Sequence, residues 1–238
     1  MKTFRFLMIA ALLVVVAGSI SSCKKDKDKR PDCRIITITP TTGDAINVSY
    51  NEDGKIAALT QGTYSTTYAH SGNNSVSTTT NSGTFSNKQI TTFNANGLTT
   101  NKRTENNVSG TVWTNEAYEY SGTELIKSTR TSSSGGAPEV TIYTFSNGNL
   151  ASATTGAGTP TTVEYFTDKS VQPGDYLLLT QLVQGIYIFK NRNLVKSVFS
   201  GSSITSFEYT FAADGSISAV KMTDGSTVMT YNLQYQCN

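Results

Sequence analysis

One short pattern recurs along most of this 238-residue chain and limits the folds that the chain can adopt. An aromatic residue is followed by a polar turn containing Asn, Asp or Gly, and then by an aliphatic residue. Because these turn residues tolerate positive φ, they favour tight hairpins. The aromatic residue should therefore end one strand, and the aliphatic residue should begin the next. The copies are Tyr50-NEDGK-Ile56, Phe93-NANG-Leu98, Tyr120-SGTE-Leu125, Phe145-SNGN-Leu150, Phe189-KNRN-Leu194 and Phe211-AADGS-Ile217, with a looser one at Tyr68-AHSGNNS-Val76.

The stretches between these turns alternate large residues with small or polar ones, as in residues 46–50, 140–145, 207–211 and 228–237. Such alternation is typical of strands that pack on one face. The copies follow one another every 18–27 residues, with one double interval, so one period holds two strands and two turns. The sequence thus predicts an all-β fold, a long antiparallel meander of repeated hairpins. Because such a sheet must close or protect its edges, we expect a barrel or a strongly curled sheet.

The polarity of the strands bears on whether such a barrel would cross a membrane. A membrane-spanning barrel needs a continuous apolar outer band with aromatic girdles. Residues 77–82 read Ser-Thr-Thr-Thr-Asn-Ser, which cannot easily face lipid. We therefore expect a soluble barrel.

One segment breaks the hairpin period and predicts a short helix at about residues 175–184. Asp175 can cap its start and Gly185 its end. A buried strand over residues 176–183 is the alternative. The helix either closes one barrel mouth or, as we prefer, covers apolar surface. The apolar residues with helical spacing are Leu179, Leu182, Val183 and Ile186.

The first 22 residues have the layout of an export signal. Lys2 and Arg5 form a positive start, residues 6–17 are uninterrupted apolar sequence, and small residues follow. The alternative is a membrane-spanning helix, which needs about 20 apolar residues and is therefore less well supported. We expect a signal peptide over residues 1–22 and an exported protein.

Cys23 lies where cleavage would occur. The sequence Ile20-Ser-Ser-Cys23 resembles the lipobox of bacterial lipoproteins, in the form seen in Bacteroidota-type envelopes. The resemblance implies that Cys23 becomes the acylated first residue, although ordinary cleavage before an unmodified Cys is an alternative. Residues 23–32 are charged and have almost nothing apolar to bury, so they should form a solvated tether. Residues 33–238 then form a single domain whose weakly acidic balance does not indicate nucleic-acid binding.

The other two cysteines, Cys33 and Cys237, bracket the predicted domain. In an oxidising compartment two cysteines predict one disulfide, which would join the first strand to the last. Two free thiols are the alternative. A tetrahedral metal site needs four ligands, and Cys33, Cys237 and His70, the chain's one histidine, supply three. We therefore expect no metal site.

Two resemblances extend this interpretation. The segments Tyr50–Ile56 and Phe211–Ile217 resemble the YD repeat, Tyr-Asp-x-x-Gly-x-Leu. The layout of nearly the whole chain resembles a group of Bacteroidota lipoproteins of unassigned function with a porin-like β fold. These share the Lys/Asp tether, the repeated hairpins and an ending like Tyr235-Gln-Cys237. The resemblance implies a fold and an outer-membrane location, on the periplasmic or the surface face, but no activity.

The sequence contains little that indicates catalysis. His70 lies in what we expect to be an exposed polar turn, and no cofactor motif is present. We therefore expect a non-catalytic, lipid-anchored binding or scaffold module whose partner is an envelope protein, a glycan or a lipid. One alternative is a carrier for a small apolar ligand or glycan, with candidate ligand-binding residues Trp113, Tyr118, Tyr120, Leu179 and Leu182. Another is a glycoside hydrolase using the carboxylates of Glu116 and Glu119, or of Glu164 and Glu208.

Overall fold

The computed structural model describes residues 33–237, which form one closed barrel of sixteen antiparallel strands. The predicted signal peptide, Cys23 and the tether lie outside the described residues. The strands are β1 Cys33–Pro40, β2 Ile46–Tyr50, β3 Ile56–Gln61, β4 Tyr64–Ser71, β5 Asn74–Asn81, β6 Thr84–Phe93, β7 Thr99–Glu105, β8 Trp113–Ser121, β9 Glu124–Ser132, β10 Glu139–Ser146, β11 Asn149–Thr155, β12 Thr161–Ser170, β13 Asn193–Ser200, β14 Ser203–Phe211, β15 Ile217–Asp224 and β16 Thr227–Cys237.

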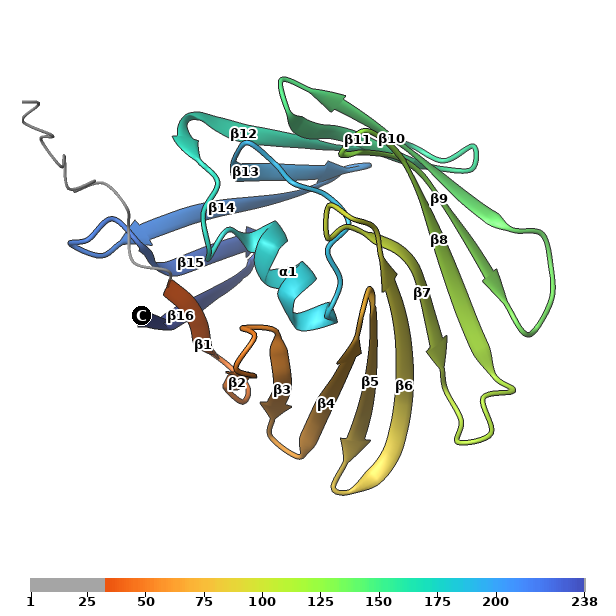
Figure 1. The fold of residues 1–238 in the computed structure, drawn as a ribbon. Helices are drawn as coiled ribbons and strands as arrows, with labels where there is room; N and C mark the ends of the chain where they lie inside the picture. Colours follow the sequence, from red (N-terminus) through yellow and green to blue (C-terminus); the bar gives the residue numbers. More distant parts are fainter. Residues whose placement is uncertain (1–32, 238) are drawn as a thin grey trace, which may run out of the picture. The chain divides into compact units, whose positions relative to one another are not determined.

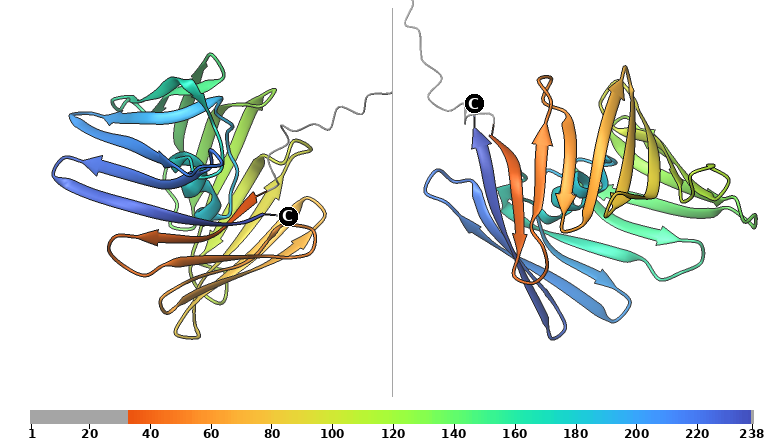
Figure 2. Two further views of the ribbon diagram at one scale, coloured as in Figure 1. Left: turned by 90° about the vertical axis from the view of Figure 1, so that its left-hand side faces the viewer. Right: turned by 90° about the horizontal axis from the view of Figure 1, so that it is seen from below.

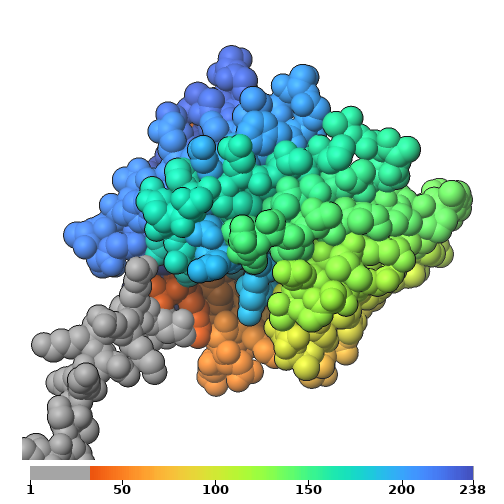
Figure 3. All heavy atoms as spheres, turned by 90° about the horizontal axis from the view of Figure 1, so that it is seen from above, coloured from red at the N-terminus to blue at the C-terminus, as the bar shows by residue number. Residues whose placement is uncertain are grey.

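Each strand pairs with the next one in the sequence, and β1 pairs with β16 to close the ring (Figure 1). The surface view shows the same order, because the colours follow one another across the wall in sequence order (Figure 3). The predicted meander is confirmed, and the structure selects the closed barrel over the open curled sheet. Cys33 and Cys237 lie opposite each other in the β1–β16 register and form the predicted disulfide.

The repeated sequence unit corresponds to a bulged hairpin. In five copies the strand register shifts at the aromatic residue, so that one extra residue is accommodated on the strand after the turn. Such bulges bend a strand and increase its twist, which helps a sheet to curl into a barrel. The aliphatic residue after the turn is buried in most copies, namely Leu98, Leu125, Leu150 and Ile217.

Two copies depart from the predicted hairpin. Strand β4 continues past Tyr68 to Ser71, and Tyr68 pairs with Ser77 without a bulge, so this looser copy is an ordinary hairpin. Phe189 does not end a strand, because the preceding strand β12 ends at Ser170 and Phe189 lies in the long connection to β13. Leu194 is nevertheless the second residue of β13 and is fully buried. The motif therefore specifies neither feature in every copy, since Ile56 and Val76 follow hairpin turns but are only half-buried.

The connection from β12 to β13 runs through the barrel interior and contains the predicted helix, α1 Tyr176–Gln184 (Figures 1 and 2). We call residues 171–192 the crossing segment. Asp175 caps the start of α1, and Gly185 ends it with a left-handed φ of 63°. Leu179 and Ile186 are buried, whereas Leu182 is half-buried and Val183 is exposed. No helix within residues 33–237 is long and apolar enough to span a membrane.

The two ends of the barrel differ. Cys33, Cys237 and the crossing segment lie at the end that also carries the bulged hairpin turns, which we call the disulfide end. The opposite end, which we call the far end, carries the loops at residues 106–112 and 133–138. The main hydrophobic core packs Leu179 of α1 against buried residues of β1 and β13–β16, including Ile38, Leu194 and Ile217.

Several ion pairs lie on the outer face of the wall. The parity of each strand assigns this face, because Gln89 reaches the crossing segment and Phe207 lies in the core, so Lys88 and Glu208 point outward. The outer ion pairs, joining Nζ to carboxylate oxygens at 2.7–3.6 Å, include Lys88–Glu105, Lys127–Glu119 and Lys221–Glu208.

Candidate functional site: two cavities beside the crossing segment

Glycines at both ends of α1 hold the crossing segment close to the barrel wall. A Cβ added at Gly174 would lie 2.8–2.9 Å from atoms of Leu233, Tyr235 and Ile217, and one at Gly185 would lie 2.8 Å from the Tyr68 ring. The nine-residue helix is about 14 Å long. It therefore reaches from β15 and β16 on one side of the interior to β4 on another.

Asp175 fixes the start of the helix. Its side chain is fully buried and accepts hydrogen bonds from the backbone N–H groups of Leu177, Leu178 and Val195 and from the Tyr209 hydroxyl, at 2.9–3.2 Å. Burial raises the pKa of this carboxyl, and the four donors offset part of that effect. Asp175 thus connects α1 to β13 and β14 through one buried group.

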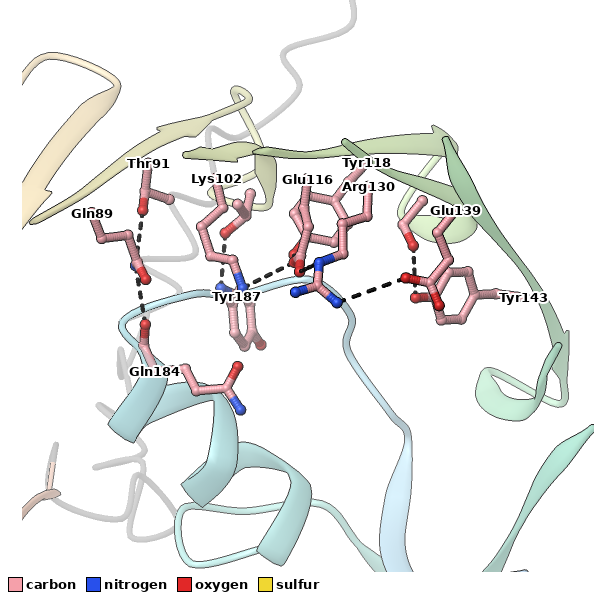
Figure 4. Close-up of polar contacts among 12 residues, drawn as sticks. Gln89, Thr91, Lys102, Glu116, Tyr118, Arg130, Glu139, Tyr143, Gln184 and Tyr187 are labelled. Carbon is pink, nitrogen blue, oxygen red and sulfur yellow. Dashed lines mark hydrogen bonds and ion pairs between the residues drawn. The ribbon is translucent and has the colours of Figure 1, made fainter. Parts of the chain in front are cut away.

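The part of the crossing segment that follows α1 is hydrogen-bonded to β6 and β7. The Thr99 N–H donates to the Tyr187 carbonyl at 2.7 Å, and the Tyr187 N–H donates to Thr99 Oγ1 at 2.9 Å. Gln89 Nε2 donates to the Gln184 carbonyl at 3.1 Å (Figure 4). Gln181, which is buried, accepts the N–H of Ile188 through Oε1 at 2.7 Å. The segment is therefore fixed to both sides of the barrel.

An apolar cavity of about 400 Å³ lies at the disulfide end, between α1 and the wall formed by β1 to β6. Two of the polar side chains that line it are hydrogen-bonded to the backbone of neighbouring strands. The Tyr50 hydroxyl donates to the Ile35 carbonyl at 2.8 Å, and His70 Nε2 lies 2.7 Å from the Ile56 carbonyl. Burial raises the pKa of the Tyr68 hydroxyl to about 12, so it stays protonated at neutral pH. The other lining residues include Cys33, Arg34, Phe93, Leu178, Leu182 and Tyr187.

A polar cavity of about 300 Å³ lies against the inner face of β7 to β10, next to residues 184–188 (Figure 4). Lys102 Nζ lies 2.9 Å from Glu116 Oε2, which also accepts the Tyr118 hydroxyl, and Arg130 lies between Glu116 and Glu139 at 4.0 and 3.7 Å. Burial opposes ionisation of Glu116, but the bonds from Tyr118 and Lys102 outweigh it and lower the pKa of the carboxyl. The two acids and two bases thus neutralise one another.

The candidate ligand-binding residues are placed on different surfaces. Tyr118 and Tyr120 point into the barrel, where Tyr118 contacts the polar cavity and the Tyr120 hydroxyl donates to the Thr99 carbonyl. Trp113 pairs with Glu105 on the outer face, and its ring lies 4.6 Å from the Arg103 guanidinium carbon. The structure therefore does not bring Trp113 together with the two tyrosines. Leu179 and Leu182 both line the apolar cavity.

The carboxylate pairs are not brought together either. Glu116 faces inward, but Glu119 faces outward and binds Lys127. Glu164 and Glu208 are exposed and bind Lys196 and Lys221, respectively.

The expectation that His70 lies in an exposed turn is wrong. His70 is on β4, because that strand continues to Ser71, and its half-buried ring lines the apolar cavity and stacks with Tyr68 at 6.2 Å. Sequence analysis also missed Lys102, Arg130 and Glu139 of the polar cavity. One signal was available, the alternation of side chains between the two faces of each strand. It places all three residues on the inner face, with Lys102 and Arg130 opposite Glu116 and with Glu139 opposite Arg130.

Comparison with known proteins supports the fold. No family model and no curated protein matches the sequence. A crystal structure described as a porin-like protein from Bacteroides uniformis ATCC 8492 has a TM-score of 0.62 and 14% identity, covering 85% of this chain and 96% of that one. Another, from Bacteroides vulgatus ATCC 8482, has a TM-score of 0.57 and 12% identity, covering 85% and 98%. At this identity the similarity establishes a porin-like barrel fold alone.

Proposed function

We propose that this chain is a non-catalytic binding module of the cell envelope, anchored to the outer membrane through acylated Cys23. One observation carries the proposal: the crossing segment is hydrogen-bonded to both sides of the barrel and leaves ligand-sized cavities beside it. Cavities of about 300–1,000 Å³ are typical of ligand sites. A barrel whose interior is occupied in this way is better suited to holding a ligand than to conducting solutes.

The outer face supports an anchor rather than insertion of the barrel. Lipid-facing charges at the bilayer midplane cost about 2–4 kcal/mol for Arg or Lys. If the barrel spanned a membrane, the outer ion pairs on β6 to β9 and on β14 and β15 would face lipid. Acyl chains on Cys23 would instead hold the barrel at the membrane surface, because each buried methylene contributes about 0.8 kcal/mol.

Fractionation of cells that express the full chain tests the anchor. We expect the wild-type protein in the outer-membrane fraction and the Cys23→Ala variant in soluble form or retained with its uncleaved signal. A Cys23→Ala variant that is processed and still sediments with the outer membrane would refute the anchor. A Cys33→Ala variant is the matched control, because Cys33 is in the disulfide and not in the lipobox-like sequence.

Native mass spectrometry tests the binding role. We expect residues 24–238, produced in a periplasm and incubated with a total envelope extract, to retain an adduct of defined mass. A bare protein mass at every extract concentration would contradict a small-molecule binding module.

A further inference from the structure

The apolar cavity keeps its shape without a ligand. One side is α1, which Asp175, Gly174 and Gly185 fix against the wall at close approach. The other side consists of strands held by the β-ladder. Since neither side can move without breaking buried hydrogen bonds, the cavity cannot collapse onto itself. Predominantly apolar pockets of this size are typical sites for small apolar ligands.

The lining determines which ligand chemistry fits. Ile35, Ile56, Phe93, Leu178 and Leu182 provide apolar surface. Three of the polar groups that line the same space are already bonded within the protein: Tyr50 to Ile35, His70 to Ile56, and Gln181 to the backbone at residues 188 and 189. The hydroxyl-bearing side chains of Tyr68 and Tyr187 line it as well. A ligand that needs many hydrogen bonds would find few partners here. An unbranched hydrocarbon chain needs none.

Among the described residues that line the cavity, Arg34 is the one with a permanently charged side chain. Its guanidinium carbon lies 5.7 Å from the centre of the Tyr50 ring. A Cβ at Gly54 would lie 2.4 Å from the same guanidinium, so the glycine in the turn after β2 leaves the space that Arg34 occupies. A positive charge held in place beside an apolar cavity is complementary to a hydrocarbon chain with an anionic head group.

The position of the cavity agrees with such a ligand. Cys33 lines the cavity, so the chain enters the barrel there. The ten residue-to-residue steps from Cys23 to Cys33 span at most about 33–36 Å when extended. If the protein is anchored as proposed above, the cavity lies close to a membrane that contains acyl chains.

We propose that this cavity binds the acyl chain of a single-chain amphiphile, with Arg34 beside its anionic head group. This inference rests on the proposed envelope function and specifies its ligand class. The chain would lie between α1 and β1–β6, with its head group at the β1 side.

Isothermal titration of residues 24–238, which contain the whole closed barrel, with oleate below its micellar concentration tests the proposal. We expect one oleate per protein and at least tenfold weaker binding of oleyl alcohol. Leu178→Trp, which fills the cavity from α1, should weaken oleate binding at least tenfold, and Ile56→Trp should do the same from the opposite wall. Val183→Trp is the matched control, because Val183 is on the same helix but does not line this cavity. It should leave oleate binding within twofold.

The charge is tested separately. Arg34→Gln should weaken oleate binding about tenfold and leave oleyl alcohol binding unchanged, whereas Lys221→Gln on the outer face should change neither. Thermal unfolding of every variant establishes that it is folded. Absence of oleate binding, or binding that both cavity-filling variants leave unchanged, would overturn the inference.

The failure of this inference is distinguishable from failure of the proposed function. An envelope adduct of another mass, retained while oleate does not bind, overturns only the ligand class. If residues 24–238 bind oleate but the acylated full chain in lipid nanodiscs does not, the chain's own acyl group occupies the cavity, and a free amphiphile is excluded.

Discussion

At the scale of single residues, Asp175 joins more elements than any neighbouring side chain in the crossing segment. It caps α1 and also accepts hydrogen bonds from β13 and β14. Replacing it with Ala removes the cap, which costs about 1 kcal/mol. It also leaves buried donors unsatisfied, at about 1–3 kcal/mol. We expect Asp175→Ala to lower the free energy of unfolding by about 2–4 kcal/mol in urea denaturation. Asp168→Ala, at an exposed carboxylate on β12, should change it by less than about 0.5 kcal/mol.

The raised pKa of Asp175 also predicts a pH dependence. Because the folded pKa lies above the unfolded value of about 3.9, the folded state binds more protons between the two values. The stability that Asp175 contributes is therefore largest at low pH and falls as pH rises through the folded pKa. We expect the difference in unfolding free energy between wild type and Asp175→Ala to decrease from pH 3.5 toward neutrality. A difference that grows with pH would mean that the four donors outweigh burial.

At the scale of elements, the crossing segment contacts β7 through two hydrogen bonds between Thr99 and Tyr187, one of which uses the Thr99 hydroxyl. Thr99→Val removes the acceptor of the Tyr187 N–H and leaves that donor unsatisfied. We expect faster hydrogen–deuterium exchange across residues 184–189, equivalent to about 1–3 kcal/mol of lost protection, with β13–β16 unchanged. Thr99→Ser restores the hydroxyl and should restore the slow exchange. Unchanged exchange in Thr99→Val would show that the segment is held by its other contacts.

The elements also show what local sequence can and cannot predict. The bulged hairpins and α1 were predictable because turn residues, caps and apolar spacing act over a few residues. The path of the crossing segment was not predictable, since Thr99 and Tyr187 meet across 88 residues of sequence. Phe189 illustrates the same limit: it has the sequence of a hairpin aromatic, but its ring packs with Tyr118, Leu125 and Leu150 in the barrel interior.

The candidate site was predictable in part for the same reason. Leu179 and Leu182 were found because helical spacing identifies the packed face of a helix. The grouping of Trp113 with Tyr118 and Tyr120 did not take strand parity into account, and parity separates residues 113 and 118 onto opposite faces. His70 was misplaced because the sequence around it resembles a turn, whereas β4 continues for three residues past Tyr68.

At the scale of the whole molecule, the disulfide joins the two ends of a chain that already pair as β1 and β16. A cross-link over 204 residues stabilises by up to about 5 kcal/mol in the chain-entropy model. We expect the double variant Cys33→Ala and Cys237→Ala to keep the barrel, with an unfolding free energy lower by as much as that amount. Wild type in reductant should match it. Loss of the β-sheet signal before denaturant is added would mean that the backbone pairing of β1 with β16 cannot close the barrel alone.

The outer face of the barrel leads to a prediction about solubility. The outer ion pairs on β6 to β9 and on β14 and β15 would lose their hydration if those strands faced lipid. We therefore expect residues 24–238, exported without a lipidation sequence, to be soluble without detergent and monodisperse in size-exclusion chromatography. Replacing the outer carboxylates Glu105, Glu119 and Glu208 with Leu should reduce that solubility, because it adds apolar surface to the outer face of the barrel. Sedimentation of the unmodified barrel with membranes after an alkaline wash would show that the wall itself inserts, and the anchor would then serve another purpose.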